Sequence, residues 1–168
     1  AGMTREADVV SGSWSITFEE GSLPQSDGET FTMAAIATDL AKNVSTELTQ
    51  DVVIDNMAGS LALSTAPIEG NNIVNADEAS NGLFVRGTSD PGNVIEVTLG
   101  DAKSTAITGF DGKWAAEFKS HQLEDGQFHA PITATTTDAA GNMREVKGTV
   151  EFDTEVRNLG ISSADVTD

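Results

Sequence analysis

Residues 11–18 (SGSWSITF) return about 100 residues later as residues 111–118 (DGKWAAEF), with Gly, Trp and Phe at matching places. The match continues in the same order, with insertions or deletions of one or two residues between the copies. It pairs Asp27-Gly28 with Asp125-Gly126, residues 38–43 (TDLAKN) with 137–142 (TDAAGN), and residues 53–55 (VID) with 151–153 (EFD). A period of this length is typical of tandem domains, because the units of solenoids run about 20–50 residues.

Alternation of apolar and polar residues, broken by clusters of Gly, Asp, Asn and Pro, predicts seven strands in the copy that follows residue 55. They lie near residues 60–64, 82–88, 94–99, 104–108, 114–118, 129–137 and 144–152. One helical turn is expected near residues 76–80. Seven short strands within about 100 residues predict an all-β fold, an immunoglobulin-like (Ig-like) antiparallel β-sandwich repeated in tandem.

The period divides the chain into one complete domain and two partial flanking copies. Residues 56–155 are expected to form the complete Ig-like repeat, residues 1–55 the last four strands of a preceding repeat, and residues 156–168 the linker and first strand of a following repeat. The first three strands of the preceding repeat would lie ahead of Ala1. Half a sandwich exposes its core, so residues 1–55 need those strands, strands of another chain, or crystal contacts to cover them.

The composition disfavours several classes of partner. A formal net charge of −18, from 27 acidic and 9 basic residues, disfavours nucleic acid and anionic membranes, which require clustered Lys and Arg. A hard cation is the natural counter-charge. The absence of cysteine excludes disulfides and thiolate chemistry. No apolar run approaches a membrane span, and the chain start lacks a signal-peptide pattern, so we expect an interior excerpt of a longer protein without membrane insertion.

The sequence carries no pattern typical of an enzyme. His121 and His129 are not spaced as metal ligands and are expected to be solvent-exposed. Nucleophile-elbow, phosphate-loop and dinucleotide-binding motifs are absent from the sequence. Trp14 and Trp114 each follow a tight turn and open an alternating strand pattern, which favours core packing over sugar stacking. We therefore expect no catalytic residue.

Calcium is the leading chemical hypothesis, because it takes six to eight oxygen ligands and several Asp-rich loops converge at each pole of such a sandwich. One pole is expected to gather Asp90, Asp111, Asp138 and Asn142 near Asp55 in the incoming linker. The other is expected to gather Asp77, Glu78, Asp101, Glu124 and Asp125 near Asp153 in the outgoing linker. Turn geometry is the alternative for each Asp, since its side chain bonds its own backbone. This alternative is strongest for Asp111, which opens an Asp-Gly hairpin turn.

Five motifs occur in a fixed order along the complete copy: residues 72–79 (NIVNADEA), 85–88 (VRGT), 111–114 (DGKW), 137–142 (TDAAGN) and 152–153 (FD). In combination they resemble the bacterial Ig-like repeats of giant surface adhesins of the biofilm-associated and repeats-in-toxin group. The resemblance implies a secreted stalk of many copies at the bacterial cell surface. It also favours metal binding over turn geometry for Asp55 and Asp153 in the linkers, and for Asp39 and Asp138 in the matching loops.

The candidate metal ligands are therefore Asp39, Asn43, Asp55, Asp77, Asp90, Asp138, Asn142 and Asp153, with Ca²⁺ as the expected cofactor. The predicted function is that of a structural stalk repeat that supports adhesion or biofilm formation and contacts neighbouring repeats of its own chain. Two alternatives stay open. One is a module that binds a glycan or a protein, although Phe110 is the only aromatic residue in the polar loops. The other is a filament subunit completed by strand donation from another copy.

Overall fold

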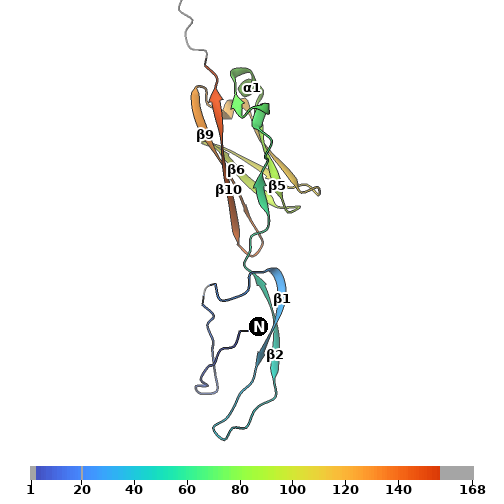
Figure 1. The fold of residues 1–168 in the computed structure, drawn as a ribbon, viewed down its shortest axis with the longest axis vertical. Helices are drawn as coiled ribbons and strands as arrows, with labels where there is room; N and C mark the ends of the chain where they lie inside the picture. The colour runs from blue at the N-terminus through green and yellow to red at the C-terminus, as the bar shows by residue number, and fades with distance from the viewer. Residues whose placement is uncertain (1–2, 20, 156–168) are drawn as a thin grey trace, which may run out of the picture. The chain divides into compact units, whose positions relative to one another are not determined.

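The computed structural model describes residues 3–19 and 21–155 (Figure 1). The chain divides into two compact units, unit 1 (Ala1–Met57) and unit 2 (Ala58–Asp168), and each is described by itself. The strand of a following repeat that the sequence predicts within residues 156–168 lies outside the described residues.

Unit 2 is an all-β sandwich of two sheets. The larger sheet has the order β4-β10-β9-β6-β7, and the smaller has the order β3-β5-β8. The strands are β3 (Leu61–Leu63), β4 (Ile73–Val74), β5 (Leu83–Ser89), β6 (Val94–Leu99), β7 (Ala102–Ile107), β8 (Lys113–Phe118), β9 (Gln127–Thr137) and β10 (Met143–Asp153), joined in part by the short helices η1 (Ile68–Gly70), α1 (Ala76–Asn81) and η2 (Ser120–Gln122). This architecture confirms the predicted Ig-like fold class.

The core of unit 2 lies between the two sheets, because alternate side chains of each strand turn inward. Along β5 and β8 every second residue is buried. The largest fully buried side chains are Phe118, Phe152, Leu83 and Ile95. Each predicted strand is present within one or two residues of its expected bounds, and the predicted helical turn is α1. Asn75 caps α1 in a reciprocal pair of hydrogen bonds with Glu78, which explains why a helix begins there.

One strand of unit 2, β4, was not predicted from the sequence. β4 pairs in parallel with the end of β10, with Ile73 opposite Glu151 and Val74 opposite Phe152. A strand of two residues has no measurable alternation. It nevertheless buries Val74 completely in the core.

Unit 1 contains two antiparallel strands, β1 (Asp27–Ala35) and β2 (Leu48–Asp55), which lie side by side in Figure 1. Of the four strands predicted for residues 1–55, the described residues form only these last two. Residues 11–18 are not a strand, and Trp14 is 55% exposed, so the prediction that it packs in a core is wrong. The physical reason is that β8, its counterpart region, is held by β5, and the described part of unit 1 has no strand equivalent to β5.

The two units share one strand register. Phe31 faces Val52 in unit 1 as Ala130 faces Val150 in unit 2. The register shifts between Asp27 and Glu29, where Gly28 adopts a φ of 84°, a conformation that glycine allows without strain. Because of this one-residue bulge, Asp27 lies opposite Asp55 as Gln127 lies opposite Asp153. The structural counterpart of Asp27 is therefore Gln127, and the sequence match of Asp27 to Asp125 is wrong.

Candidate metal centre

Two carboxylates meet at the end of the β1–β2 ladder. Asp27 opens β1 and Asp55 closes β2, and the strand register places them directly opposite each other. Their carboxylate oxygens approach within 4.8 Å. The backbone beneath them is fixed by Ser26, whose N–H donates to Asn56 Oδ1 at 2.9 Å and whose carbonyl accepts the Asn56 N–H at 2.9 Å. Ser26 is buried, so this end of the ladder is a defined scaffold for the pair.

The spacing of this pair fits a hard cation. Two oxygens that each lie about 2.3–2.6 Å from one Ca²⁺ ion are separated by at most about 5 Å, and the observed separation falls within that limit. Like charges directly opposite each other destabilise an antiparallel pair, and a bound cation offsets that repulsion. Unit 2 differs here, because the Gln127 amide donates to Asp153 Oδ2 at 3.5 Å. The donor set of unit 1 is thus the better match to calcium.

Sequence reasoning named Asp55 and omitted Asp27. The signal that could have identified Asp27 is its position at the start of a strand that pairs with the strand ending in Asp55. Reading it requires the bulge at Gly28, which shifts the register by one residue. Apart from the glycine, a bulge of this kind does not change the alternation of apolar and polar residues in the sequence.

The loops that follow β1 and β9 are the same structure twice. In unit 1, Asp39 accepts hydrogen bonds from the backbone N–H and the side-chain amide of Asn43, both at 2.8 Å. In unit 2, Asp138 accepts the same two bonds from Asn142, both at 2.9 Å. These bonds close each loop on itself, which accounts for the Asp-to-Asn spacing by turn geometry.

The same bonds set the acidity of the two loop carboxyls. The amide of Asn43 is the main cause that lowers the pKa of Asp39, and the amide of Asn142 is the main cause that lowers the pKa of Asp138. Each carboxyl is therefore an anion at neutral pH, with its oxygens already accepting protein hydrogen bonds. Such a group can still add a lone pair to a cation, since a carboxylate offers about four acceptor sites.

Removing the amide of Asn142 is expected to raise the pKa of Asp138 towards its usual range. A lowered pKa means that the loop stabilises the fold at neutral pH and loses that contribution as pH falls through the folded-state pKa. The Asn142→Ala variant should therefore show a weaker decline of stability in acid. An NMR titration of the Asp138 carboxyl carbon measures the shift, and Asn43→Ala serves as a control that moves Asp39 alone. An unchanged Asp138 pKa would contradict this assignment.

Asp90 holds the start of β3. Its Oδ2 accepts the Ser60 backbone N–H at 2.6 Å, and its Oδ1 accepts the Ser60 hydroxyl at 2.7 Å. A side chain at Gly59 would collide with the Asp90 carboxylate and would displace it from its hydrogen bonds with Ser60. Asp111 accepts the Lys113 backbone N–H at 3.2 Å, in agreement with the hairpin-turn interpretation.

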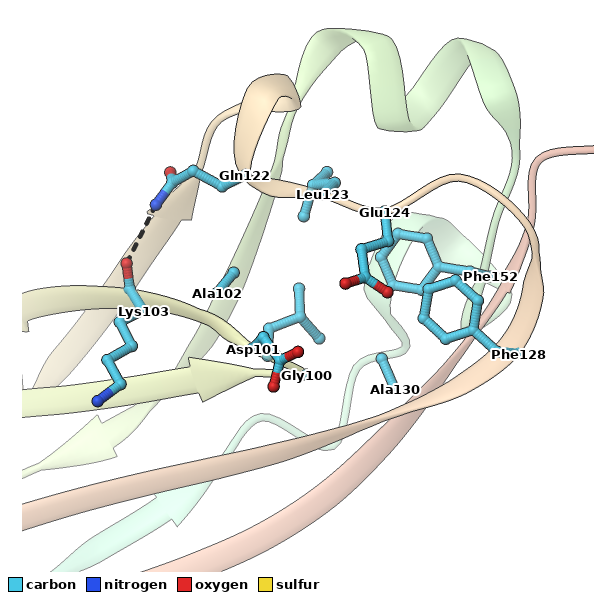
Figure 2. A pocket seen from close by; sticks show the side chains of 11 residues that line it. Gly100, Asp101, Ala102, Lys103, Gln122, Leu123, Glu124, Phe128, Ala130 and Phe152 are labelled. Atoms are coloured by element: carbon cyan, nitrogen blue, oxygen red, sulfur yellow. Dashed lines mark hydrogen bonds between the residues drawn. The ribbon is translucent and has the colours of Figure 1, made fainter.

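The acidic residues at the other end of unit 2 are only partly brought together. Asp101 and Glu124 line one cavity of about 430 Å³, and their carboxylates point towards each other across its opening in Figure 2. Its floor includes Phe128 and Phe152, whose rings stack with centroids 5.1 Å apart. Asp77 lies in the first turn of α1, where Glu78 completes the helix cap. Within the described residues, Asp77, Asp90 and Asp153 belong to no group of three converging acidic or histidine ligands.

Two sheets enclosing one core, with the order and connections seen in unit 2, define an immunoglobulin-like domain. The profile of the bacterial Ig-like domain family matches residues 67–154, which is more than half of the chain. The chain belongs to this family.

Several solved structures are similar at low identity. One is a Ca²⁺-stabilised adhesin that helps an Antarctic bacterium reach out and bind ice, at 22% identity and a TM-score of 0.45, covering 75% of this chain and 32% of that one. A tetra-tandem repeat from the extending region of a large adhesion protein gives 23% identity and a TM-score of 0.44, with coverage of 75% and 32%. A single bacterial Ig-like domain from the M. primoryensis ice-binding adhesin gives 21% identity and a TM-score of 0.42, with coverage of 57% and 98%.

This chain spans about a third of the first of these structures. A search of curated proteins returned no significant match. None of the helices in residues 3–19 and 21–155 has the length and hydropathy needed to cross a bilayer.

Proposed function

We propose that this chain is part of the stalk of a secreted adhesin at a bacterial cell surface. In this role it holds a distal binding region away from the cell as a structural element without catalytic activity. Ca²⁺ at the joints between repeats converts a flexible string of domains into a stiffer rod. The stalk would support adhesion or biofilm formation by its length and stiffness.

The pair of opposed carboxylates in unit 1 carries the calcium part of the proposal. Asp27 and Asp55 offer oxygens at a spacing that one Ca²⁺ ion can bridge. The net charge of −18 supplies the electrostatic reason for a cation, since this charge destabilises compact and aligned states by self-repulsion. Membership of the bacterial Ig-like family and the internal repeat support the stalk role.

The other candidate ligands remain part of this proposal, and the structure supports some of them as Ca²⁺ ligands better than others. Asp138 and Asn142 lead among them, followed by their counterparts Asp39 and Asn43, because each loop presents an ionised carboxylate. Asp90 ranks lower because both of its oxygens bind Ser60. Asp77 and Asp153 complete the set as candidates near an outgoing joint.

Calcium acts in this proposal by mass action. An ion that binds the folded state and not the unfolded state stabilises the fold by RT ln(1 + [L]/Kd), about 2.7 kcal/mol at 100 times Kd. The ion removes repulsion between Asp27 and Asp55 at the same time. Chelation should therefore lower both the melting temperature and the order of the β1–β2 end.

Calcium titration followed by calorimetry tests the ligand assignment. Asp55→Asn is expected to weaken Ca²⁺ binding by about tenfold or more, because the affinity of oxygen sites depends on ligand charge. Asp51→Asn is the matched control, since Asp51 lies on the same strand, carries the same charge, and pairs with the Thr32 hydroxyl instead of a carboxylate. Equal effects of the two substitutions, or no calcium binding by the parent chain, would refute the assignment.

A further inference from the structure

Unit 2 has a second cavity, of about 160 Å³, on the side of the sandwich where β3 and β10 adjoin. We call this the side cavity. Its wall is formed by residues of the segment 63–72 and of β5, β9 and β10. Gly148, which lines it, is the middle residue of β10, so the cavity lies midway along that strand instead of at a pole of the sandwich. Because its volume corresponds to about five molecules of liquid water, it suits a small molecule or one unit of a larger one.

Arg86 supplies the charge of the side cavity. It lies on the outer face of β5, where its guanidinium carbon is 4.8 Å from the centroid of the Phe84 ring, the geometry of a cation–π contact. Among the residues that the structure describes, no carboxylate forms a salt bridge with Arg86, although the chain carries 27 acidic residues. The ring of Phe84 therefore orients a guanidinium group that can bind a carboxylate through two parallel hydrogen bonds.

Two polar side chains of the side cavity are held in place by the backbone around them. The Ser64 N–H donates to the Arg86 carbonyl at 2.8 Å, and the Ser64 hydroxyl oxygen accepts the Ala66 N–H at 3.1 Å. The Asn72 side-chain amide donates to the Thr149 carbonyl at 3.1 Å. These bonds leave the hydroxyl proton of Ser64 as a donor and Oδ1 of Asn72 as an acceptor. A ligand that carries hydroxyl groups can use both.

The segment 67–72 gives the side cavity an apolar wall, Pro67 and Ile68, on a strained backbone. Glu69 has a φ of 50° and Asn72 a φ of 65°, values that are uncommon for residues other than glycine. The Asn72 N–H donates to the Ile68 carbonyl at 2.8 Å, and the Asn72 carbonyl accepts the Glu151 N–H at 3.2 Å, which ties the segment to β10. Strain of this kind persists where the surrounding structure holds it, and it is typical of ligand sites.

We propose that the side cavity binds one unit of a sugar acid, a hexuronate. Its carboxylate pairs with Arg86, its hydroxyl groups bond Ser64 and Asn72, and its ring packs against Pro67 and Ile68. A carboxylate without a ring leaves the polar groups of Ser64 and Asn72 unused, and a neutral sugar leaves Arg86 without a counter-charge. An acidic peptide supplies the carboxylate but not the ring of hydroxyl groups. This inference goes beyond the stalk role and does not depend on calcium.

An NMR titration of the full ¹⁵N-labelled chain with sodium glucuronate tests the proposal. Calcium is first removed on a chelating resin, so that the ion cannot bridge the uronate and the protein. Salt is held at about 0.15 M to screen the repulsion of an anion by the net charge of −18. We expect saturable shifts of the amide signals of residues 63–72, 84–86 and 148–149. Glucose, acetate and a glutamate-containing tripeptide should each bind at least about tenfold more weakly, because each lacks a set of contacts.

Two variants separate the site from a general effect of charge. Arg86→Gln is expected to weaken glucuronate binding by at least about tenfold, the loss of a charge-assisted pair of hydrogen bonds. Arg144→Gln is the matched control, because Arg144 lies on β10 outside the side cavity and its loss changes the net charge equally. It should leave the affinity within about twofold, since exposed charges are screened at this salt concentration. Absence of saturable shifts, equal effects of the two substitutions, or acetate or the tripeptide binding as tightly as glucuronate would overturn the proposal.

Discussion

Trp114→Ala is expected to lower the free energy of unfolding of unit 2 by about 3–5 kcal/mol, the cost of removing a large buried side chain and leaving a cavity. Trp114 is 3% exposed and belongs to the core cluster, and its strand β8 is part of the smaller sheet β3-β5-β8. Trp14→Ala is the matched control, because the same residue in the same repeat position is 55% exposed. It is expected to change stability by less than about 0.5 kcal/mol.

Urea denaturation followed by circular dichroism measures the effect of Trp114→Ala on the unfolding of unit 2 and the effect of Trp14→Ala on the unfolding of unit 1. The comparison is informative because sequence alone treats the two tryptophans as equivalent. Similar losses of stability in the two variants would show that Trp14 is packed in a core, contrary to the structure. A negligible loss for Trp114→Ala would show that the sandwich core is not centred where the structure places it.

Gly87→Ala is expected to destabilise unit 2 by about 3 kcal/mol, at the upper end of the usual cost of overpacking. Gly87 lies in β5 directly opposite Trp114. A Cβ at this position would collide with the backbone oxygen of Ala62 and with the indole ring of Trp114. The backbone oxygen belongs to the neighbouring strand β3 and cannot move without breaking the sheet.

A second substitution separates the two collisions. Gly87→Ala combined with Trp114→Phe shortens the ring but leaves the Ala62 oxygen in place, so it is not expected to restore stability. Gly148→Ala is the control from a strand interior, because its Cβ would approach only the Leu63 methyl group, at 2.9 Å, and Ile132 at 4.0 Å. That methyl can rotate away, and the expected cost is below about 1 kcal/mol. Equal costs at Gly87 and Gly148 would contradict the packing described for β5.

The sandwich of unit 2 was predictable because each long strand has one buried and one exposed face. β5 and β8 alternate without a break, and the burial of Trp114 in β8 confirms the prediction that this residue packs in the core. Turn residues such as Gly112, with a φ of 75°, marked the hairpins. β4 was missed because its stability comes from parallel pairing with β10, a non-local contact that leaves no local pattern.

In unit 1 the internal repeat led to a wrong prediction, the burial of Trp14. Similar sequence at Trp14 and Trp114 predicts similar structure only if the neighbouring strands are also present, and burial depends on those neighbours. Only one residue of the carboxylate pair, Asp55, was proposed from the sequence, and the reason is related. Asp55 was proposed from its position in the linker. Asp27 could not be proposed in this way, because a one-residue bulge decides which residue lies opposite Asp55. Asp138 and Asn142 were predicted as metal ligands, which stays a prediction, and the hydrogen bonds that Asn142 donates to Asp138 explain their spacing without a metal.

Small-angle X-ray scattering of the chain with Ca²⁺ and with a chelator tests the central claim most directly. If calcium stiffens the joint between repeats, the ion should lengthen the maximum particle dimension and narrow the distance distribution, and the chelator should reverse both changes. Asp55→Asn should abolish the response and Asp51→Asn should retain it. Identical scattering of the parent chain with and without Ca²⁺ would contradict the calcium-stiffened stalk.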